Sequence, residues 1–441
     1  MDSKLDNASK PYEISKKLHE FYRGKIEVTP RCVIRDLNDF SYWYTPGVAQ
    51  PCMEIHADPR NARKYTNRSN MVAVVSDGTR VLGLGNIGPL AGLPVMEGKA
   101  LIFKYLGGVD AFPLVINVHS VREIVDFVKA VSPSFGGINL EDIETPKCFH
   151  VLDALRDELD IPVWHDDRQG TATIILAGVF SSLKLKNLKI EDAKFVLFGA
   201  GASNLAVADL LEVSGADPGN IVLLDKSGIL NKNSIQDPDN PFKNKWSQIS
   251  NKTQLSGGLD DALKGANFLI ALSTPGPDII KSHQIALMDK DPAVFACANP
   301  VPEIWPWVAK EAGAFITATG RSDFENQLNN SMVFPGMFRG ALDCGARKIT
   351  DDMCVTAAQA ISGRAEELGL DPGHIVPTME DDETHVRVAV AAAKHAMELG
   401  LAEFPNSLEY FEESARAHIS HAKKTVKTLM QQEIIRKPPE I

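Results

Sequence analysis

The sequence predicts an α/β fold divided between two domains and completed by C-terminal helices. Short apolar runs of strand length alternate with segments of helical periodicity, a pattern typical of largely buried parallel sheets. The 441 residues exceed what a single hydrophobic core usually covers. We therefore place the first domain at residues 1–168, the second at residues 169–385 and a helical extension at residues 386–441.

Composition and charge exclude several classes of protein. Apolar residues make up 44% and charged residues 23% of the chain, as in ordinary globular proteins. The formal net charge of −11 repels phosphate backbones and anionic lipids, so we expect neither nucleic acid nor a membrane as a partner. The N-terminus fits neither a signal nor a transit peptide, and no apolar run approaches the roughly 20 residues that span a bilayer. Six scattered cysteines predict reduced, mostly buried thiols and a cytoplasmic protein.

The first domain is predicted as alternating helices and strands. Apolar residues at helical spacing indicate a helix from Tyr12 to Tyr22, and Pro46 and Gly47 then shape a loop that presents Tyr44. Continuous apolar runs further along predict buried strands, and a 3.6-residue periodicity predicts a helix between them. The strands are placed at 71–76, 100–105, 112–118 and 161–165, and the helix at 121–131.

The second domain follows an apolar helix at 170–185 that joins the two halves. It opens with a βαβ unit, in which a glycine turn at 199–203 separates a strand from a helix and the next strand ends at Asp225. The strands and helix of this unit are placed at 194–198, 204–213 and 221–224. Further strands are predicted at 267–272, 294–298 and 314–317, and helices at 352–370 and 382–400. The charged tail after Ser407 is predicted to be a helix that packs on the other domain or on a second subunit.

Two glycine-rich segments compete as the loop that would bind the phosphates of a dinucleotide. The segment 83–88 matches G-x-G-x-x-G, but Pro89 and Pro94 follow it, and we expect no helix to open there. The turn at 199–203 stands between a strand and a helix, which is the context of a Rossmann-type binding loop, although Asn204 occupies the third glycine position. We therefore assign the dinucleotide to this turn, which comprises Gly199, Ala200, Gly201, Ala202 and Ser203.

The choice between NAD and NADP stays open. Asp225 ends the strand after the turn, where an acidic residue usually binds the ribose 2′-hydroxyl of NAD. Lys226 and Lys232 follow closely, however, and either ammonium group could bind a 2′-phosphate.

Acidic pairs near apolar strands indicate a metal site. Glu141-Asp142 follows a glycine-rich segment, and Asp166-Asp167 follows the predicted strand at 161–165. Crowded carboxylates repel one another unless a cation neutralises them, and Mg²⁺ or Mn²⁺ prefers oxygen ligands. We also expect burial or the metal to lower the pKa of Lys99, directly before the predicted strand at 100–105, towards that of a general base.

Together these segments resemble the malic enzyme family in its compact microbial form. The resemblance runs in family order from about residue 40 to 345 and rests on YTPGVAQPC, SDGTRVLGLGNIGPLAGLPVMEGKA, FGGINLEDI, PVWHDDRQGTA, GAGAS, ACANP and GRSDFENQLNN. It implies Tyr44 as the general acid, Lys99 as the general base and Asp166 as the neighbour that supports the lysine. It also implies that the metal is bound by Glu141, Asp142 and Asp167 and the substrate by Arg80, Asn299 and Asn330, with Asn299 bordering the cofactor.

The implied activity is the oxidation and decarboxylation of malate to pyruvate with NAD or NADP and Mg²⁺ or Mn²⁺, in a dimer or larger homo-oligomer. Two alternatives stay open. The same scaffold could convert malate to lactate with bound NAD and no net redox change. The protein could also be a dinucleotide-binding regulator without turnover, although such a protein would need neither Tyr44 and Lys99 nor the metal ligands.

Overall fold

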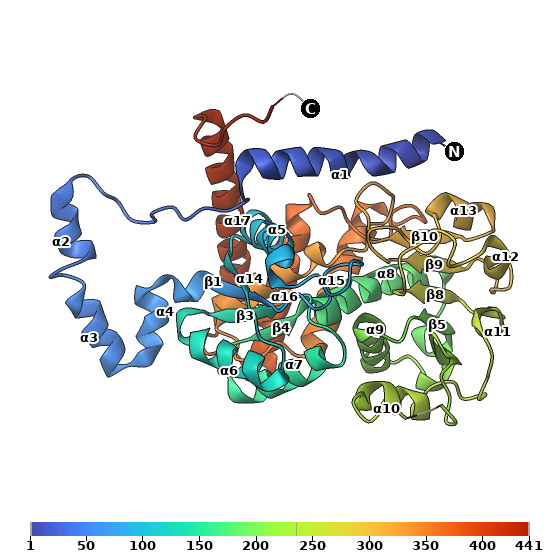
Figure 1. Cartoon of the computed structure of the whole chain (residues 1–441). Coiled ribbons are helices and arrows are strands. Elements are labelled where there is room, and N and C mark those ends of the chain that lie inside the picture. The colour runs from blue at the N-terminus through green and yellow to red at the C-terminus, as the bar shows by residue number, and fades with distance from the viewer. Residues whose placement is uncertain (1, 235, 440–441) are drawn as a thin grey trace.

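The computed structural model describes residues 2–234 and 236–439. Its first sheet is parallel, with the strand order β2 (Asp110–Val115), β1 (Met71–Ser76), β3 (Gly137–Leu140) and β4 (Val163–His165). The β1 residues from Val72 to Val75 are fully buried, as expected of a strand covered on both faces. The covering helices, shown on opposite sides of the sheet in Figure 1, are α5 (Pro89–Gly107) and α14 (Phe334–Cys344) on one side and α6 (Val121–Val131) and α7 (Lys147–Glu158) on the other.

The second sheet has the topology of a doubly wound nucleotide-binding domain. Its order is β10 (Ile316–Thr319), β9 (Ala293–Ala296), β8 (Phe268–Ala271), β5 (Phe195–Phe198), β6 (Ile221–Asp225) and β7 (Gly228–Ile229), of which only β7 is antiparallel to its neighbour. The chain runs from β5 out to β6 and then returns to the other side of β5 for β8. The strand order therefore reverses between β5 and β8, where ligands bind in open α/β sheets.

Helices of the C-terminal region join the two halves. The predicted linker helix is α8 (Thr171–Lys186), which is buried along most of its length and packs against α15 (Asp351–Gly369) and α9 (Ala202–Val213). The predicted tail helix is α17 (Leu408–Gln431), and it packs against α16 (Asp382–Glu398) and α5. A Cβ on Gly108, at the end of α5, would lie 2.7 Å from the backbone of His418, so the tail lies close against the first domain.

One predicted strand is wrong. Residues 100–105 belong to helix α5, which begins at Pro89 directly after Gly88. Proline is tolerated at the first helical position because its missing N–H has no partner there in any case. The periodicity misleads because α5 packs against β2 and α14 while its exposed residues, among them Leu90 and Leu101, are apolar as well. The expectation that no helix follows the glycines at 83–88 is also wrong, because Pro89 takes the first helical position and the helix continues past Pro94.

The segment between the first helix and the first sheet extends away from the body of the protein. Helix α1 (Asp2–Tyr22) is longer than predicted, and its last residue donates a hydrogen bond from Tyr22 Oη to the carbonyl of Arg436. Residues 32–61, which we call the arm, then form two short helices, α2 (Phe40–Trp43) and α3 (Ala49–Ala57), that project to the left in Figure 1. Among the described residues, no side-chain hydrogen bond or ion pair joins the arm to the rest of the chain.

Candidate active site

A cavity of about 830 Å³ lies between the two sheets. The first domain lines it with the loop after β1, the middle of α5 and the loop after β3. The second domain contributes the N-terminus of α9 and the loops after β8, β9 and β10. Because these strands are parallel, their carboxyl ends bring polar loops from both domains to one place. Ten of the predicted site residues line this cavity: Arg80, Lys99, Glu141, Asp142, Asp167, Gly201, Ala202, Ser203, Asn299 and Asn330.

Three carboxylates converge at one side of the cavity. Oxygens of Glu141, Asp142 and Asp167 lie within 4.8 Å of one another. Burial and, after it, repulsion between neighbouring carboxylates raise the pKa of Glu141 well above its ordinary value and that of Asp142 to about 8. Asp142 holds a backbone φ of 55°, which is uncommon for a residue with a side chain, and its buried Oδ2 has no hydrogen-bond partner. An unpartnered buried oxygen beside two further carboxylates fits a hard divalent cation.

Lys99 lies beside this cluster on α5. Its Nζ is 3.1 Å from Glu141 Oε1 and donates a hydrogen bond to Asp166. Burial alone would lower the pKa of Lys99, but the Asp166 and Glu141 carboxylates outweigh it and raise the pKa above its ordinary value. The expected lowering is therefore not found in the metal-free protein. Asp166 does not line the cavity; it also accepts a hydrogen bond from Trp164 Nε1 at 2.8 Å, which fixes the carboxylate that holds the lysine.

The glycine turn has the geometry of an anion-binding loop. Gly199 has a φ of +100°, and a Cβ there would lie 2.8 Å from the Leu272 carbonyl, so the position needs glycine. A Cβ on Gly201 would meet nothing within 4 Å, and the N–H groups that follow it at the start of α9 are available to an anion. Asn204, the departure from the glycine pattern, donates from Nδ2 to the carbonyls of Phe198 and Gly199 at 3.0 Å and so braces the turn.

Asp225 ends β6, the strand beside the glycine turn, but does not line the cavity. Its carboxylate is bonded by Lys243 and by the main-chain N–H of Ser227. Partial burial would raise the pKa of Asp225, but these two partners outweigh the burial and lower it. The sequence reasoning missed Lys243, because it considered only Lys226 and Lys232, which follow Asp225 directly in the chain.

Tyr44 is the predicted catalytic residue that the structure separates from the others. It follows α2 on the arm, its side chain is 69% exposed, and it does not line the cavity. The helix α1 instead brings Ser15 and His19 to the cavity, and neither had been singled out by a motif.

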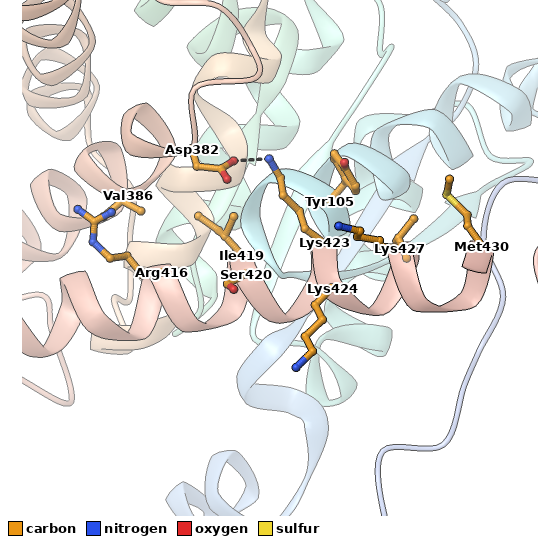
Figure 2. A pocket seen from close by; sticks show the side chains of 11 residues that line it. Tyr105, Asp382, Val386, Arg416, Ile419, Ser420, Lys423, Lys424, Lys427 and Met430 are labelled. Carbon is orange, nitrogen blue, oxygen red and sulfur yellow. Dashed lines mark hydrogen bonds and ion pairs between the residues drawn. The ribbon is translucent and has the colours of Figure 1, made fainter. Parts of the chain in front are cut away.

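A second cavity, of about 670 Å³, lies along α17 on the first-domain side (Figure 2). Lysines line it, where Lys423 pairs with Asp382, Lys424 follows it and points to the other side of the helix, and Lys427 lies one turn further along. Tyr105, at the end of α5, contributes an aromatic ring to the same cavity. Without converging carboxylates or a glycine turn, this cavity is not a second candidate for the chemistry of the first.

Two family models match the chain in the order of its two sheets. The malic enzyme N-terminal domain matches residues 23–156, and the malic enzyme NAD binding domain matches residues 168–397. The chain belongs to the malic enzyme family. Among curated members, it is 45% identical to the NAD-dependent malic enzyme of Geobacillus stearothermophilus, over 87% of this chain and 79% of that one. It is 44% identical to the bifunctional malic/malolactic enzyme of Bacillus subtilis, over 90% of this chain and 96% of that one.

Solved malic enzymes share the fold over nearly the whole chain. The crystal structure of the Entamoeba histolytica malic enzyme superposes with a TM-score of 0.95 at 42% identity, over 97% of this chain and 90% of that one. The Pyrococcus horikoshii malic enzyme gives a TM-score of 0.90 at 46% identity, over 95% and 99%. The predicted α/β class and Rossmann-type second domain are thereby confirmed. Among the described residues, no helix is both long and apolar enough to cross a bilayer.

Proposed function

We propose that this malic enzyme, which converts (S)-malate to pyruvate and CO₂ while it reduces NAD⁺ or NADP⁺, carries out the reaction in the cavity between its two sheets with a bound Mg²⁺ or Mn²⁺. One observation carries the proposal: a single cavity holds three converging carboxylates, a buried lysine and the open N-terminus of a helix that follows a glycine turn. A dinucleotide-binding regulator would need only the last of these features. The names of relatives at 40–45% identity support the same reaction.

The residues of the cavity divide the chemistry between them. A divalent cation held by Glu141, Asp142 and Asp167 would polarise the C2 oxygen of the substrate, and the dinucleotide would accept the hydride from C2. A cation among the three carboxylates would favour the neutral amine of Lys99, which is placed to take the proton of the C2 hydroxyl, and Asp166 would hold the ammonium that results. Arg80, Asn299 and Asn330 line the same cavity and supply donors for the substrate carboxylates. Tyr44 would then donate a proton to C3 after CO₂ has left.

The test is an assay with malate, Mn²⁺ and each dinucleotide, with pyruvate, lactate and NAD(P)H measured separately. The proposal predicts equal amounts of pyruvate and NAD(P)H, no activity after exhaustive chelation, and recovery with Mn²⁺ or Mg²⁺ but not with Ca²⁺ at a comparable rate. Lactate without net NADH would show the redox-neutral reaction, which the similarity to a bifunctional malic/malolactic enzyme keeps as the second candidate. Dinucleotide binding without any product would favour the regulator.

We further propose that Lys243 decides how well NADP is used. It neutralises Asp225 at the end of β6, where the ribose of a dinucleotide on the glycine turn lies in Rossmann-type domains. An ammonium group there can bind a 2′-phosphate, whereas a bare carboxylate would repel it. Lys243→Gln should lower kcat/KM for NADP about tenfold or more while NAD is little affected. Equal losses with both dinucleotides would assign Lys243 a structural role instead.

We propose that the working protein is a homodimer or larger homo-oligomer in which the arm of one copy completes the site of another. Within one copy Tyr44 is exposed on the arm, and the cavity lacks the acid that the reaction needs. The arm also exposes large apolar side chains that folding would ordinarily bury, with Leu37 at 85%, Tyr42 at 66% and Met53 at 61%.

A matching apolar surface lies beside the cavity. Leu90, Leu101 and Tyr105 of α5 are 79%, 40% and 40% exposed, and their spacing places them on one face of the helix. Leu84, in the loop before α5, is 63% exposed and lies next to the cavity-lining Gly83. This stripe leads from the cavity towards the groove along α17, where Tyr105 also lies (Figure 2). An arm packed along it would bury both apolar surfaces and bring Tyr44 to the cavity.

Mixing two inactive variants tests whether the site is shared. Lys99→Ala and Tyr44→Phe should each be nearly inactive alone. If Tyr44 acts on the partner, subunit exchange should restore about a quarter of wild-type activity, because half the dimers are mixed and one of their two sites is intact. Sites built within one copy would regain nothing, because every site in the mixture would then lack one of the two residues.

The predicted domain boundaries and the cytoplasmic location remain part of this proposal. The first sheet ends at His165 and the second begins at Phe195, which supports a division at 168/169. All six cysteines are free, and four of them are buried, as suits a reducing compartment.

A further inference from the structure

The metal-site turn and the cofactor turn are joined by one hydrogen bond. Ser203 Oγ, in the first turn of α9, donates to the main-chain carbonyl of Asp167 at 2.7 Å. Asp167 lies in the π-helical turn Asp166–Gly170 that connects the first sheet to α8. In that turn the Thr171 N–H bonds to the carbonyls of Arg168 and Asp166, on either side of Asp167. The Asp167 carbonyl is thereby free to accept a hydrogen bond from the other domain.

Asp167 is consequently held from both domains at once. The loop after β3 donates the Asp142 N–H to its carboxylate at 2.9 Å, and the cofactor domain holds its carbonyl through Ser203. If the hydrogen bond from Ser203 is lost, the backbone at Asp167 becomes more mobile. The Asp167 carboxylate is then held less firmly beside those of Glu141 and Asp142. Ser203 also offers its own main-chain N–H at the start of α9, where an anion would bind. One residue therefore belongs to both sites.

We propose that Ser203 is a positioning residue that couples dinucleotide binding to metal binding, an inference that rests on the proposed function. A dinucleotide phosphate on the start of α9 fixes the turn, the Ser203 hydroxyl fixes Asp167, and the three carboxylates keep the spacing that a divalent ion requires. The effect is reciprocal, since a coupling free energy between two sites acts equally in both directions. Dinucleotide should then tighten Mn²⁺ binding, and Mn²⁺ should tighten dinucleotide binding by the same factor.

The experiment measures the Mn²⁺ dissociation constant of the full-length protein by electron paramagnetic resonance, without and with saturating NAD⁺ or NADP⁺ and without malate. We expect NAD(P)⁺ to tighten Mn²⁺ binding about fivefold in the wild type. In Ser203→Ala the ratio of the two dissociation constants should fall to about one. Ser203→Thr keeps the hydroxyl and should recover most of the ratio.

Ser182→Ala is the matched control, because Ser182 Oγ donates to the Gly178 carbonyl at the same 2.7 Å but inside α8, away from the cavity. It should leave the ratio unchanged even if it lowers stability. A wild-type ratio of one, or a Ser203→Ala protein that keeps the wild-type ratio, would overturn the coupling. A protein that binds no Mn²⁺ at all would instead overturn the proposed function, so the two failures can be told apart.

Discussion

Replacement of Lys99 by methionine should lower the thermal stability of the protein without metal and raise its affinity for a divalent metal. Lys99 is the cation nearest to a cluster of buried carboxylates, and its ammonium is 3.1 Å from Glu141. Methionine keeps much of the length and packing of the side chain but removes the charge. The carboxylates would then face one another with no cation among them until a metal binds.

The expected loss of stability can be estimated from the distance between Lys99 and Glu141. Two unit charges 3.1 Å apart attract by about 5 kcal/mol at an effective dielectric constant of 20. Loss of one partner from a buried pair typically costs about 3–5 kcal/mol, because the remaining charge stays desolvated. With an unfolding entropy of about 2.1 cal/mol/K per residue, this corresponds to a fall in Tm of about 3–5 °C for a chain of 441 residues. Mn²⁺ should bind at least about tenfold more tightly, since it no longer competes with an ammonium group for the same carboxylates.

Thermal unfolding in EDTA and in Mn²⁺, together with a Mn²⁺ titration, checks both halves of this prediction. The Tm deficit of Lys99→Met should be large in EDTA and mostly disappear in Mn²⁺, while malate turnover falls about 10²- to 10⁴-fold as for loss of a general base. Lys104→Met, on the same helix, is the control, because the Lys104–Asp110 pair is partly exposed and contributes little. If Lys99→Met matches the wild type in EDTA, or binds Mn²⁺ more weakly, the lysine is not the counter-ion of the cluster.

Four further substitutions test other parts of the site and the fold. Asp167→Asn should weaken Mn²⁺ binding about tenfold or more with little change in the circular dichroism spectrum, because it removes one negative ligand; wild-type affinity would contradict the ligand assignment. Gly201→Val should abolish dinucleotide binding in a fluorescence titration without unfolding the protein, since its side chain would project into open space where the phosphates approach. Gly85→Val should leave dinucleotide binding intact and lower stability by about 1–2 kcal/mol, because its φ is +78°. Burial lowers the pKa of His385 to about 4, so the unfolded state binds more protons between pH 6.5 and 4 and stability falls as the pH drops through that range. His385→Gln should remove that part of the acid sensitivity in denaturant titrations at pH 5 and 8, and an unchanged difference between the two pH values would show that other groups cause it.

The second domain could be predicted closely because its signals are local. The strand before Gly199 and the helix after Gly201 are short-range patterns, and the structure has both within one or two residues of the predicted bounds. Either acidic pair alone also fits a solvated turn, and only their joint placement among apolar strands indicated a metal site. The roles of the separate ligands, and of Arg80 and Asn299, came from the family resemblance, and the structure collects ten of the residues so assigned around one cavity.

Helix α5 and the arm were not predicted, for two different physical reasons. Periodicity reports which face of an element is polar, and α5 has no polar face to mark it as a helix, because exposed residues such as Leu90 and Leu101 are apolar as well. The position of Tyr44 depends on how the arm packs. A motif such as YTPG carries no information about which copy of the chain has the cavity that the Tyr44 side chain enters. The pKa of Lys99 depends on Asp166, 67 residues away in sequence, whose contact no local pattern encodes.

Unusual backbone conformations occur in the turns that hold the carboxylates and in the glycine turn. Asp142 has a left-handed conformation, Asp166 and Asp167 begin a π-helical turn, and Gly199 has a φ of +100°. Such conformations cost free energy and persist only where surrounding contacts impose them. Asp142 is held within its own domain by the N–H groups of Arg80 and Leu82, whereas the Asp167 turn is held by Ser203 of the other domain. The two domains are also in close contact, since a Cβ on Gly83 would lie 2.1 Å from the carbonyl of Asn299. The site geometry therefore depends on the two domains staying closed against each other, and loosening their interface should weaken metal binding before it unfolds either domain.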